Sequence, residues 1–130
     1  MRILLDTQPW LWMLAAPERF SDASRELVQS ADNELLLSAA SAWEIAIKCG
    51  LGKLQLPAEP AVSIPELMMK SATTPLPVLH GHTLHVAELP QHHLDPFDRV
   101  LVAQAQLEDL PLLTADPQFD PYDVEIIKAD

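Results

Sequence analysis

Arg2-Ile3-Leu4-Leu5-Asp6-Thr7 is the stretch of sequence that decides the fold class. A short apolar run that ends at an acid is typical of a buried strand in a parallel sheet. A second apolar run, Glu34-Leu35-Leu36-Leu37-Ser38, follows after two predicted helices. A strand, helices and a further strand in this order predict an α/β crossover fold, with a central parallel sheet flanked by helices.

The remaining elements follow from apolar spacing, capping residues and prolines. Helices are predicted from Pro9 to near Ala16, from Ser21 through Val28, over 39–49, from Ser63 with a Ser63/Glu66 capping box, over 81–88, and after Pro96. Short strands are predicted over 54–56, 75–79, 111–114 and 124–127. Because Pro75 and Pro77 lack main-chain donors, the strand over 75–79 is expected at a sheet edge.

Length and composition predict one domain spanning residues 1–130, because the chain has 130 residues and a hydrophobic content of 48%. Its apolar runs are too short to cross a bilayer, and Asp6 comes too early for a signal peptide. We therefore expect a soluble, cytoplasmic protein with no membrane association. The single cysteine, Cys49, cannot form an internal disulfide and is expected to pack as a small apolar residue.

The chain is strongly acidic, with 8 Lys and Arg against 19 Asp and Glu and a formal net charge of -11. This charge opposes long-range attraction to a nucleic acid. If the substrate is a nucleic acid, metal ions or local cations near the site must offset the repulsion. An acidic surface also suits a basic protein partner, although solubility alone explains it as well.

Four acids on separate predicted elements are the candidates for chemistry. Asp6 and Asp116 follow predicted strands, and parallel sheets bind ligands at the carboxyl ends of their strands. Asp98 falls in the first turn of the helix that Asp95 is expected to cap, above an apolar stripe that directs it to the same edge. Glu44 lies within a helix, where an i,i+4 pair with Lys48 is the ordinary explanation.

Turn formation, helix capping and ion pairing explain each acid taken singly. Four carboxylates that converge on one edge repel one another unless a cation compensates them. A hard divalent ion such as Mg²⁺ or Mn²⁺ accepts oxygen ligands and promotes phosphodiester hydrolysis by activating water. The set therefore favours a metal-dependent hydrolase that needs no Ser-His-Asp arrangement.

Six stretches of the chain, in order, resemble the PIN-domain nucleases, and specifically the VapC-type toxins. They are Leu4-Leu5-Asp6-Thr7, Ser38-Ala39-Ala40-Ser41-Ala42-Trp43-Glu44-Ile45-Ala46-Ile47-Lys48, Gly52-Lys53-Leu54, Leu89-Pro90 through His93, Asp95-Pro96-Phe97-Asp98-Arg99 and Leu113-Thr114-Ala115-Asp116. One departure is Gln8-Pro9, where such relatives often carry His after Asp-Thr. This departure puts nearby substrate contacts in question and leaves the acids intact.

The resemblance implies a PIN fold, cleavage of RNA that depends on Mg²⁺ or Mn²⁺, neutralisation by a VapB-type antitoxin, and a homodimer. It also assigns catalytic and metal-binding roles to Asp6, Glu44, Asp98 and Asp116. Candidates for outer-shell or substrate contacts are Thr7, Asp95, Arg99 and Thr114. Arg99 is suited either to bind a phosphate or to pair with a nearby Asp, and we favour the pair.

Two further interpretations, which concern the histidines and the tryptophans, are weaker. Zinc binding by His80, His82, His85, His92 and His93 lacks the usual Cys pair or HExxH spacing. Stacking of RNA bases on Trp10, Trp12 and Trp43 competes with packing in the core or in a dimer, which we favour.

Two other functions remain as alternatives to a nuclease. A phosphotransferase that forms an aspartyl phosphate usually has a second acid two residues after the first, where this chain has Gln8. A catalytically inactive PIN-like binding module is disfavoured, because all four acids are present.

Overall fold

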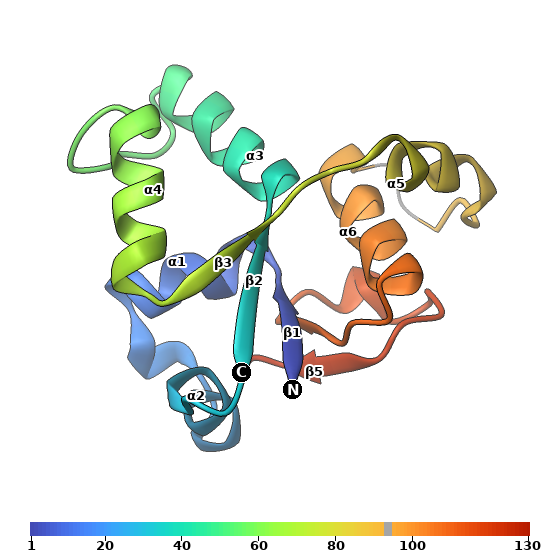
Figure 1. Ribbon diagram of the computed structural model, residues 1–130, viewed down its shortest axis with the longest axis horizontal. Helices are drawn as coiled ribbons and strands as arrows, with labels where there is room; N and C mark the ends of the chain where they lie inside the picture. The colour runs from blue at the N-terminus through green and yellow to red at the C-terminus, as the bar shows by residue number, and fades with distance from the viewer. Residues whose placement is uncertain (93–94) are drawn as a thin grey trace.

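A parallel sheet of five strands forms the centre of the computed structural model, which describes residues 1–92 and 95–130 (Figure 1). The strands are β1 (Arg2–Leu5), β2 (Glu34–Ser38), β3 (Thr73–Leu76), β4 (Leu112–Thr114) and β5 (Ile126–Lys128). Their order across the sheet is β3-β2-β1-β4-β5, and every neighbouring pair is parallel. The predicted parallel sheet is thus confirmed, and so is the edge position of the proline-containing strand β3.

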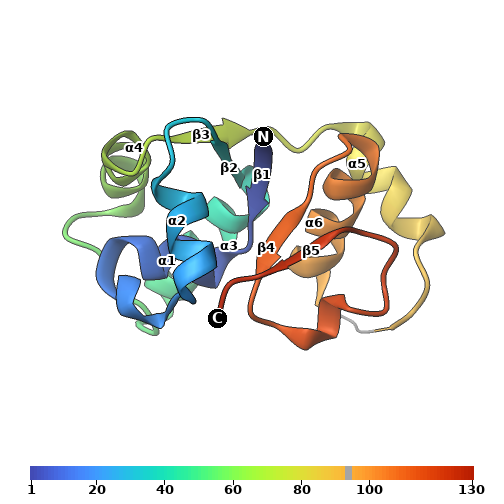
Figure 2. The same ribbon diagram turned by 90° about the horizontal axis from the view of Figure 1, so that it is seen from below.

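Helices cover both faces of this sheet. The helices are α1 (Thr7–Ala15), α2 (Asp22–Gln29), α3 (Ala39–Gly50), α4 (Pro60–Lys70), α5 (His80–His85) and α6 (Pro96–Leu107). Short 3-10 segments are η1 (Pro17–Arg19), η2 (Val86–Glu88) and η3 (Pro117–Phe119). Figures 1 and 2 show α1 to α4 on one side of the sheet, and α6 with α5 beside it on the other.

Strand β1 supplies side chains to both halves of the core. Ile3 and Leu5 pack with Ile45 of α3 on one face, whereas Leu4 packs with Leu101 of α6 on the other. Successive side chains of a strand point to opposite faces, and here both faces are covered by helices. This double burial explains why the run is apolar throughout instead of alternating with polar residues.

Several predicted bounds are wrong: β3 spans Thr73–Leu76 rather than 75–79, and α1 begins at Thr7 rather than at Pro9. Helix α4 begins at Pro60 rather than at Ser63, because Pro60 suits the first helical position. The Ser63 hydroxyl instead accepts a hydrogen bond from the Ala58 N–H at 2.8 Å and donates to the Ala58 carbonyl at 2.9 Å. Residues 54–56 form a loop rather than a strand.

The tryptophans divide between the core and the surface. Trp10 and Trp12 are buried, which confirms the prediction that they pack in the core. Trp43 is 63% exposed and lies edge-on to Phe97, with 5.1 Å between the ring centroids. It therefore lies outside the core, and a dimer contact at this residue stays a prediction.

The last residues of the chain return to the α1–α4 side of the sheet (Figure 2). There the Ser21 N–H donates to the Ala129 carbonyl at 2.9 Å, and Ser21 also caps α2, as predicted. No helix in the described part of the chain is long and apolar enough to cross a membrane.

Candidate active site

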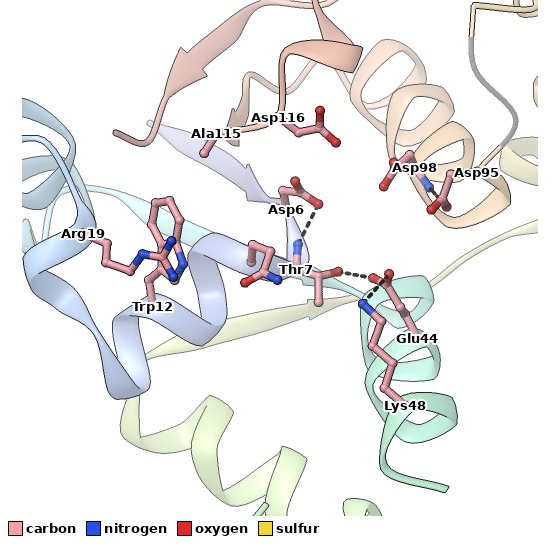
Figure 3. A pocket seen from close by; sticks show the side chains of 11 residues that line it. Asp6, Thr7, Trp12, Arg19, Glu44, Lys48, Asp95, Asp98, Ala115 and Asp116 are labelled. Atoms are coloured by element: carbon pink, nitrogen blue, oxygen red, sulfur yellow. Dashed lines mark hydrogen bonds and ion pairs between the residues drawn. The ribbon is translucent and has the colours of Figure 1, made fainter. Parts of the chain in front are cut away.

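A polar pocket of 370 Å³ lies at the carboxyl ends of β1 and β4 (Figure 3). Its lining residues are Asp6, Thr7, Gln8, Trp12, Arg19, Glu44, Lys48, Asp95, Asp98, Ala115 and Asp116. The structure thus brings together the four acids that we singled out in the sequence, from four separate segments.

Asp6 is held by contacts from two directions. It caps α1 by accepting a hydrogen bond from the Thr7 N–H at 2.8 Å, and its second oxygen accepts one from the Thr114 hydroxyl at 2.8 Å. The Thr114 hydroxyl in turn accepts from the Asp116 N–H at 3.0 Å. Thr114 therefore connects the two acids that follow β1 and β4.

Glu44 combines the ordinary ion pair with a position in the pocket. One of its oxygens lies 3.3 Å from the Lys48 ammonium, which is the pair expected from their spacing. The other oxygen accepts a hydrogen bond from the Thr7 hydroxyl at 2.7 Å. Thr7 thus joins the start of α1 to α3, and both contacts orient the Glu44 carboxylate beside Asp6 (Figure 3).

Asp95 and Asp98 enter the pocket from the start of α6. One oxygen of Asp95 accepts from the Phe97 N–H at 2.9 Å and from the Asp98 N–H at 3.1 Å. This confirms the predicted N-cap. Pro96 occupies the beginning of the helix, so Asp98 falls in its first turn and is half-buried.

Burial raises the pKa of Asp98 to about 8, and four neighbouring carboxylates add to the rise. In order of effect these neighbours are Asp6, Asp95, Glu44 and Asp116. Like charges disfavour ionisation of a shared site. The rise therefore means that the carboxylates are close enough to interact electrostatically without a compensating cation.

The pKa of Asp6 is raised to about 6, chiefly by burial. The hydrogen bonds from Thr114 and Thr7 act in the opposite direction, because they stabilise the charged form. Repulsion from Glu44 and Asp116 adds to the rise. The two threonines therefore favour an ionised Asp6 within an otherwise repulsive group of acids.

The donor set suits a hard divalent cation in type, since it consists of carboxylate oxygens. Among the described residues, however, no three His, Cys, Asp or Glu side chains stand close enough together to hold one metal ion. In this arrangement both oxygens of Asp6 and of Glu44 have protein partners. Asp116 similarly caps η3 by accepting from the Gln118 N–H at 2.9 Å.

Arg99 does not take the position that we expected for it. Its side chain is buried, and within the described part of the chain its guanidinium donates to main-chain carbonyls and to the Tyr122 hydroxyl rather than to an Asp. The carbonyls belong to Val86, Leu89 and Pro90. The residue is absent from the pocket lining, so Arg99 attaches the segment around η2 to α6.

Two of the histidines connect α5 to α6. The His82 ring lies 2.8 Å from a carboxylate oxygen of Glu108 and accepts from the Leu79 N–H at 2.9 Å. The His85 ring lies 2.7 Å from the side-chain oxygen of Gln106. His93 lies outside the described residues.

Arg19 was not among the residues that we predicted for the site. It reaches the pocket from η1, a turn of three residues after α1. Such a short turn carries no apolar periodicity, and its first residue, Pro17, indicates only that a helix ends nearby. The contact of Arg19 with Trp12 depends on how α1 and η1 pack, which the sequence pattern does not encode.

Comparisons with known proteins agree with this fold. The chain is 52% identical over 62 residues to Ribonuclease VapC16 of Mycobacterium tuberculosis (strain ATCC 25618 / H37Rv), a match that covers 48% of the chain and 44% of that protein. The match thus spans less than half the length of that relative.

Solved structures match over almost the whole chain. VapBC2 from Rickettsia felis, bound to a DNA fragment from its promoter, matches with a TM-score of 0.74 and 14% identity, over 100% of both chains. VapBC-5, a member of the VapBC family of toxin-antitoxin systems from Mycobacterium tuberculosis, matches with a TM-score of 0.64 and 20% identity, over 98% of both chains. The PIN domain model matches residues 3–125, and the chain therefore belongs to the PIN domain family.

Proposed function

We propose that the chain is an endoribonuclease that requires Mg²⁺ or Mn²⁺ and acts in the cytoplasm as the toxin of a VapBC-type toxin–antitoxin pair. The observation that carries the proposal is the pocket that four carboxylates from separate segments line together, where burial and the neighbouring acids raise the pKa values of Asp98 and Asp6. Membership of the PIN family and the partial match to a VapC ribonuclease support it.

The residues proposed to hold the cation are Asp6, Glu44, Asp98 and Asp116. When bound, Mg²⁺ or Mn²⁺ lowers the pKa of a water molecule and offsets the charge that develops on the phosphate. A carboxylate oxygen has more than one lone pair, so the hydrogen bonds to Asp6 can persist while it ligates. The Glu44 oxygen that accepts from Thr7 also keeps a lone pair, so Glu44 could ligate without losing its pair with Lys48.

Proton release is the step that these side chains themselves contribute. Because the pKa of Asp98 is about 8 without a cation, this carboxyl group is largely protonated at neutral pH. A bound cation favours the charged form of a nearby carboxyl group, so binding displaces the proton from Asp98. The affinity for the metal is therefore expected to increase with pH up to about 8.

Removal of the metal tests the enzymatic part of this proposal. Purified, partner-free protein is expected to cleave RNA with Mg²⁺ or Mn²⁺, to lose cleavage in EDTA, and to recover it with excess metal. Cleavage that persists in EDTA would contradict a metal mechanism. Binding without cleavage in every RNA pool would instead favour an inactive PIN-like module, and phosphate trapped on Asp6 would favour phosphotransfer.

A basic antitoxin is the proposed protein partner. The net charge of -11 and the acidic pocket favour a partner that inserts Arg or Lys among the carboxylates, where the cation would otherwise lie. We expect a small basic protein encoded beside this chain to co-purify with it and to abolish cleavage. If saturating partner left the rate of cleavage unchanged, inhibition through the pocket would be excluded.

A further inference from the structure

The pocket extends well beyond its acids. Figure 3 shows the four proposed ligands toward one end, and Arg19 with Trp12 at the other. Its volume of 370 Å³ equals that of about twelve water molecules of about 30 Å³ each. The pocket therefore has room for a substrate group in addition to a hydrated cation.

Arg19 is a cation held in place by an aromatic ring. Its guanidinium carbon lies 4.8 Å from the centroid of the Trp12 ring, and the side chain as a whole is exposed. Stacking on an aromatic face orders the guanidinium and leaves the donors around its edge available. Arg2, an exposed arginine at the start of β1, differs from Arg19. It is paired with Glu34, at 3.3 Å.

The positive charge of Arg19 is not neutralised by a neighbouring carboxylate. Within residues 1–92 and 95–130, no Asp or Glu forms an ion pair with Arg19. Lys48, the other cation lining the pocket, is already paired with Glu44. Arg19 thus provides the cationic group that this strongly acidic protein needs near its site if it binds a polyanion.

Trp12 is a largely buried support for Arg19, and its ring nitrogen has no acceptor among the described residues. Its ring nitrogen is buried, and the side chain as a whole is 8% exposed. Because this nitrogen is buried, it is the face of the Trp12 ring, on which Arg19 stacks, that supports the guanidinium at the pocket.

We propose that Arg19, stacked on Trp12, binds a phosphate of single-stranded RNA next to the phosphate that is cleaved. The inference rests on the proposed ribonuclease function and identifies a substrate subsite distinct from the acids. Arg19 positions the strand by charge-assisted hydrogen bonds and takes no part in breaking the bond. The role depends on the positive charge, which separates it from a purely structural role in covering Trp12.

Arg19→Gln and Arg2→Gln form a matched pair for the test, because each removes one positive charge. Arg2 begins β1 and so lies at the end of the strand opposite to Asp6. Binding is measured by fluorescence anisotropy with fluorescein-labelled single-stranded RNA in Mg²⁺, in an Asp98→Asn background that prevents turnover. Arg19→Gln is expected to weaken binding about tenfold, which corresponds to about 1.4 kcal/mol. The slope of log K against the logarithm of the salt concentration should become shallower by about 0.7, the value for one lost phosphate contact on a single strand.

Kinetics and a conservative variant separate charge from packing. In the cleaving protein, Arg19→Gln is expected to raise KM with little change in kcat, and Arg19→Lys to restore most of the salt dependence. If Arg19→Gln and Arg2→Gln lost equal RNA affinity, the effect would be explained by the change in net charge, and the subsite proposal would be overturned. A loss that Lys fails to rescue, together with a lower Tm, would also overturn it by assigning Arg19 to packing.

The outcomes also distinguish this inference from the proposed function. If the wild-type protein cleaves no RNA but its RNA binding depends on Arg19, the nuclease proposal fails and the subsite stands. If the wild-type protein cleaves RNA and Arg19→Gln binds and cleaves as well as Arg2→Gln, the subsite fails and the nuclease proposal stands.

Discussion

Asp98→Asn is expected to abolish RNA cleavage and to make the metal-free protein more stable. The proposed metal site loses a ligand, so the decrease in kcat/KM should exceed the roughly 10- to 100-fold loss typical of an outer-shell partner. Stability is expected to rise because an amide removes the ionisable group whose charged form burial and four neighbouring acids oppose. Cleavage assays and thermal unfolding in EDTA measure the two effects.

The pH dependence of unfolding gives a separate signature of Asp98. Its pKa is about 8 in the folded, metal-free protein, and an unperturbed Asp titrates near 3.9. Between these values the folded state binds more protons than the unfolded state, so the free energy of unfolding falls as pH rises from about 4 to about 8. Asp98→Asn should flatten much of this decline, and Asp6 accounts for part of the decline below its pKa of about 6.

Asp95 provides the control for Asp98. Asn caps a helix about as well as Asp, so Asp95→Asn is expected to retain the contacts with the Phe97 and Asp98 N–H groups and to fold normally. Asp95→Ala should cost about 1 kcal/mol, the usual scale for a lost N-cap. If Asp95→Asn abolished cleavage as fully as Asp98→Asn, our separation of a capping residue from a metal ligand would be wrong.

Asp6→Asn and Asp6→Ala are expected to be equally inactive and to differ in stability. Both variants remove a proposed ligand. The Asn oxygen can still accept from the Thr7 N–H, whereas Ala removes the cap of α1, at about 1 kcal/mol, and leaves the buried Thr114 hydroxyl without its acceptor, at about 1–3 kcal/mol.

Urea unfolding and cleavage assays on both Asp6 variants check this expectation. The free energy of unfolding of Asp6→Asn should lie within about 1 kcal/mol of the wild-type value. The variant loses one hydrogen bond, and this loss is partly offset because it no longer buries a charge. Substantial cleavage by Asp6→Asn would remove Asp6 from the metal site. Equal stability of the two variants would show that the cap of α1 contributes little.

The sequence could predict the sheet and the convergence of the acids because both depend on local pattern and simple topology. The apolar run that ends at Asp6 identifies a strand covered on both faces, and parallel strands bring the acids after β1 and β4 to one edge. The cap at Asp95 was equally local, since Asp followed by Pro is a common start of a helix.

Features that depend on three-dimensional packing could not be predicted in this way. The burial of Arg99 depends on carbonyls presented by the segment around η2, and the position of Arg19 depends on how η1 packs against α1. Glu44 illustrates a different limit, because its spacing from Lys48 predicted an ion pair and gave no indication of the bond from Thr7. The ion pair of Glu44 with Lys48 was thus predicted correctly, and it did not prevent Glu44 from lining the pocket.

Three acids of the pocket, Asp6, Asp95 and Asp116, are also the N-caps of helical segments. A G-to-A transition at the first position of an Asp codon gives an Asn codon, and Asn is an equally good cap. At Asp6 or Asp116, which we propose as metal ligands, one nucleotide change would therefore give a full-length, folded variant that lacks the proposed ribonuclease activity. If the chain is the toxin that we propose, cells that survive its overproduction should carry such alleles, and the variant proteins should still bind the proposed antitoxin.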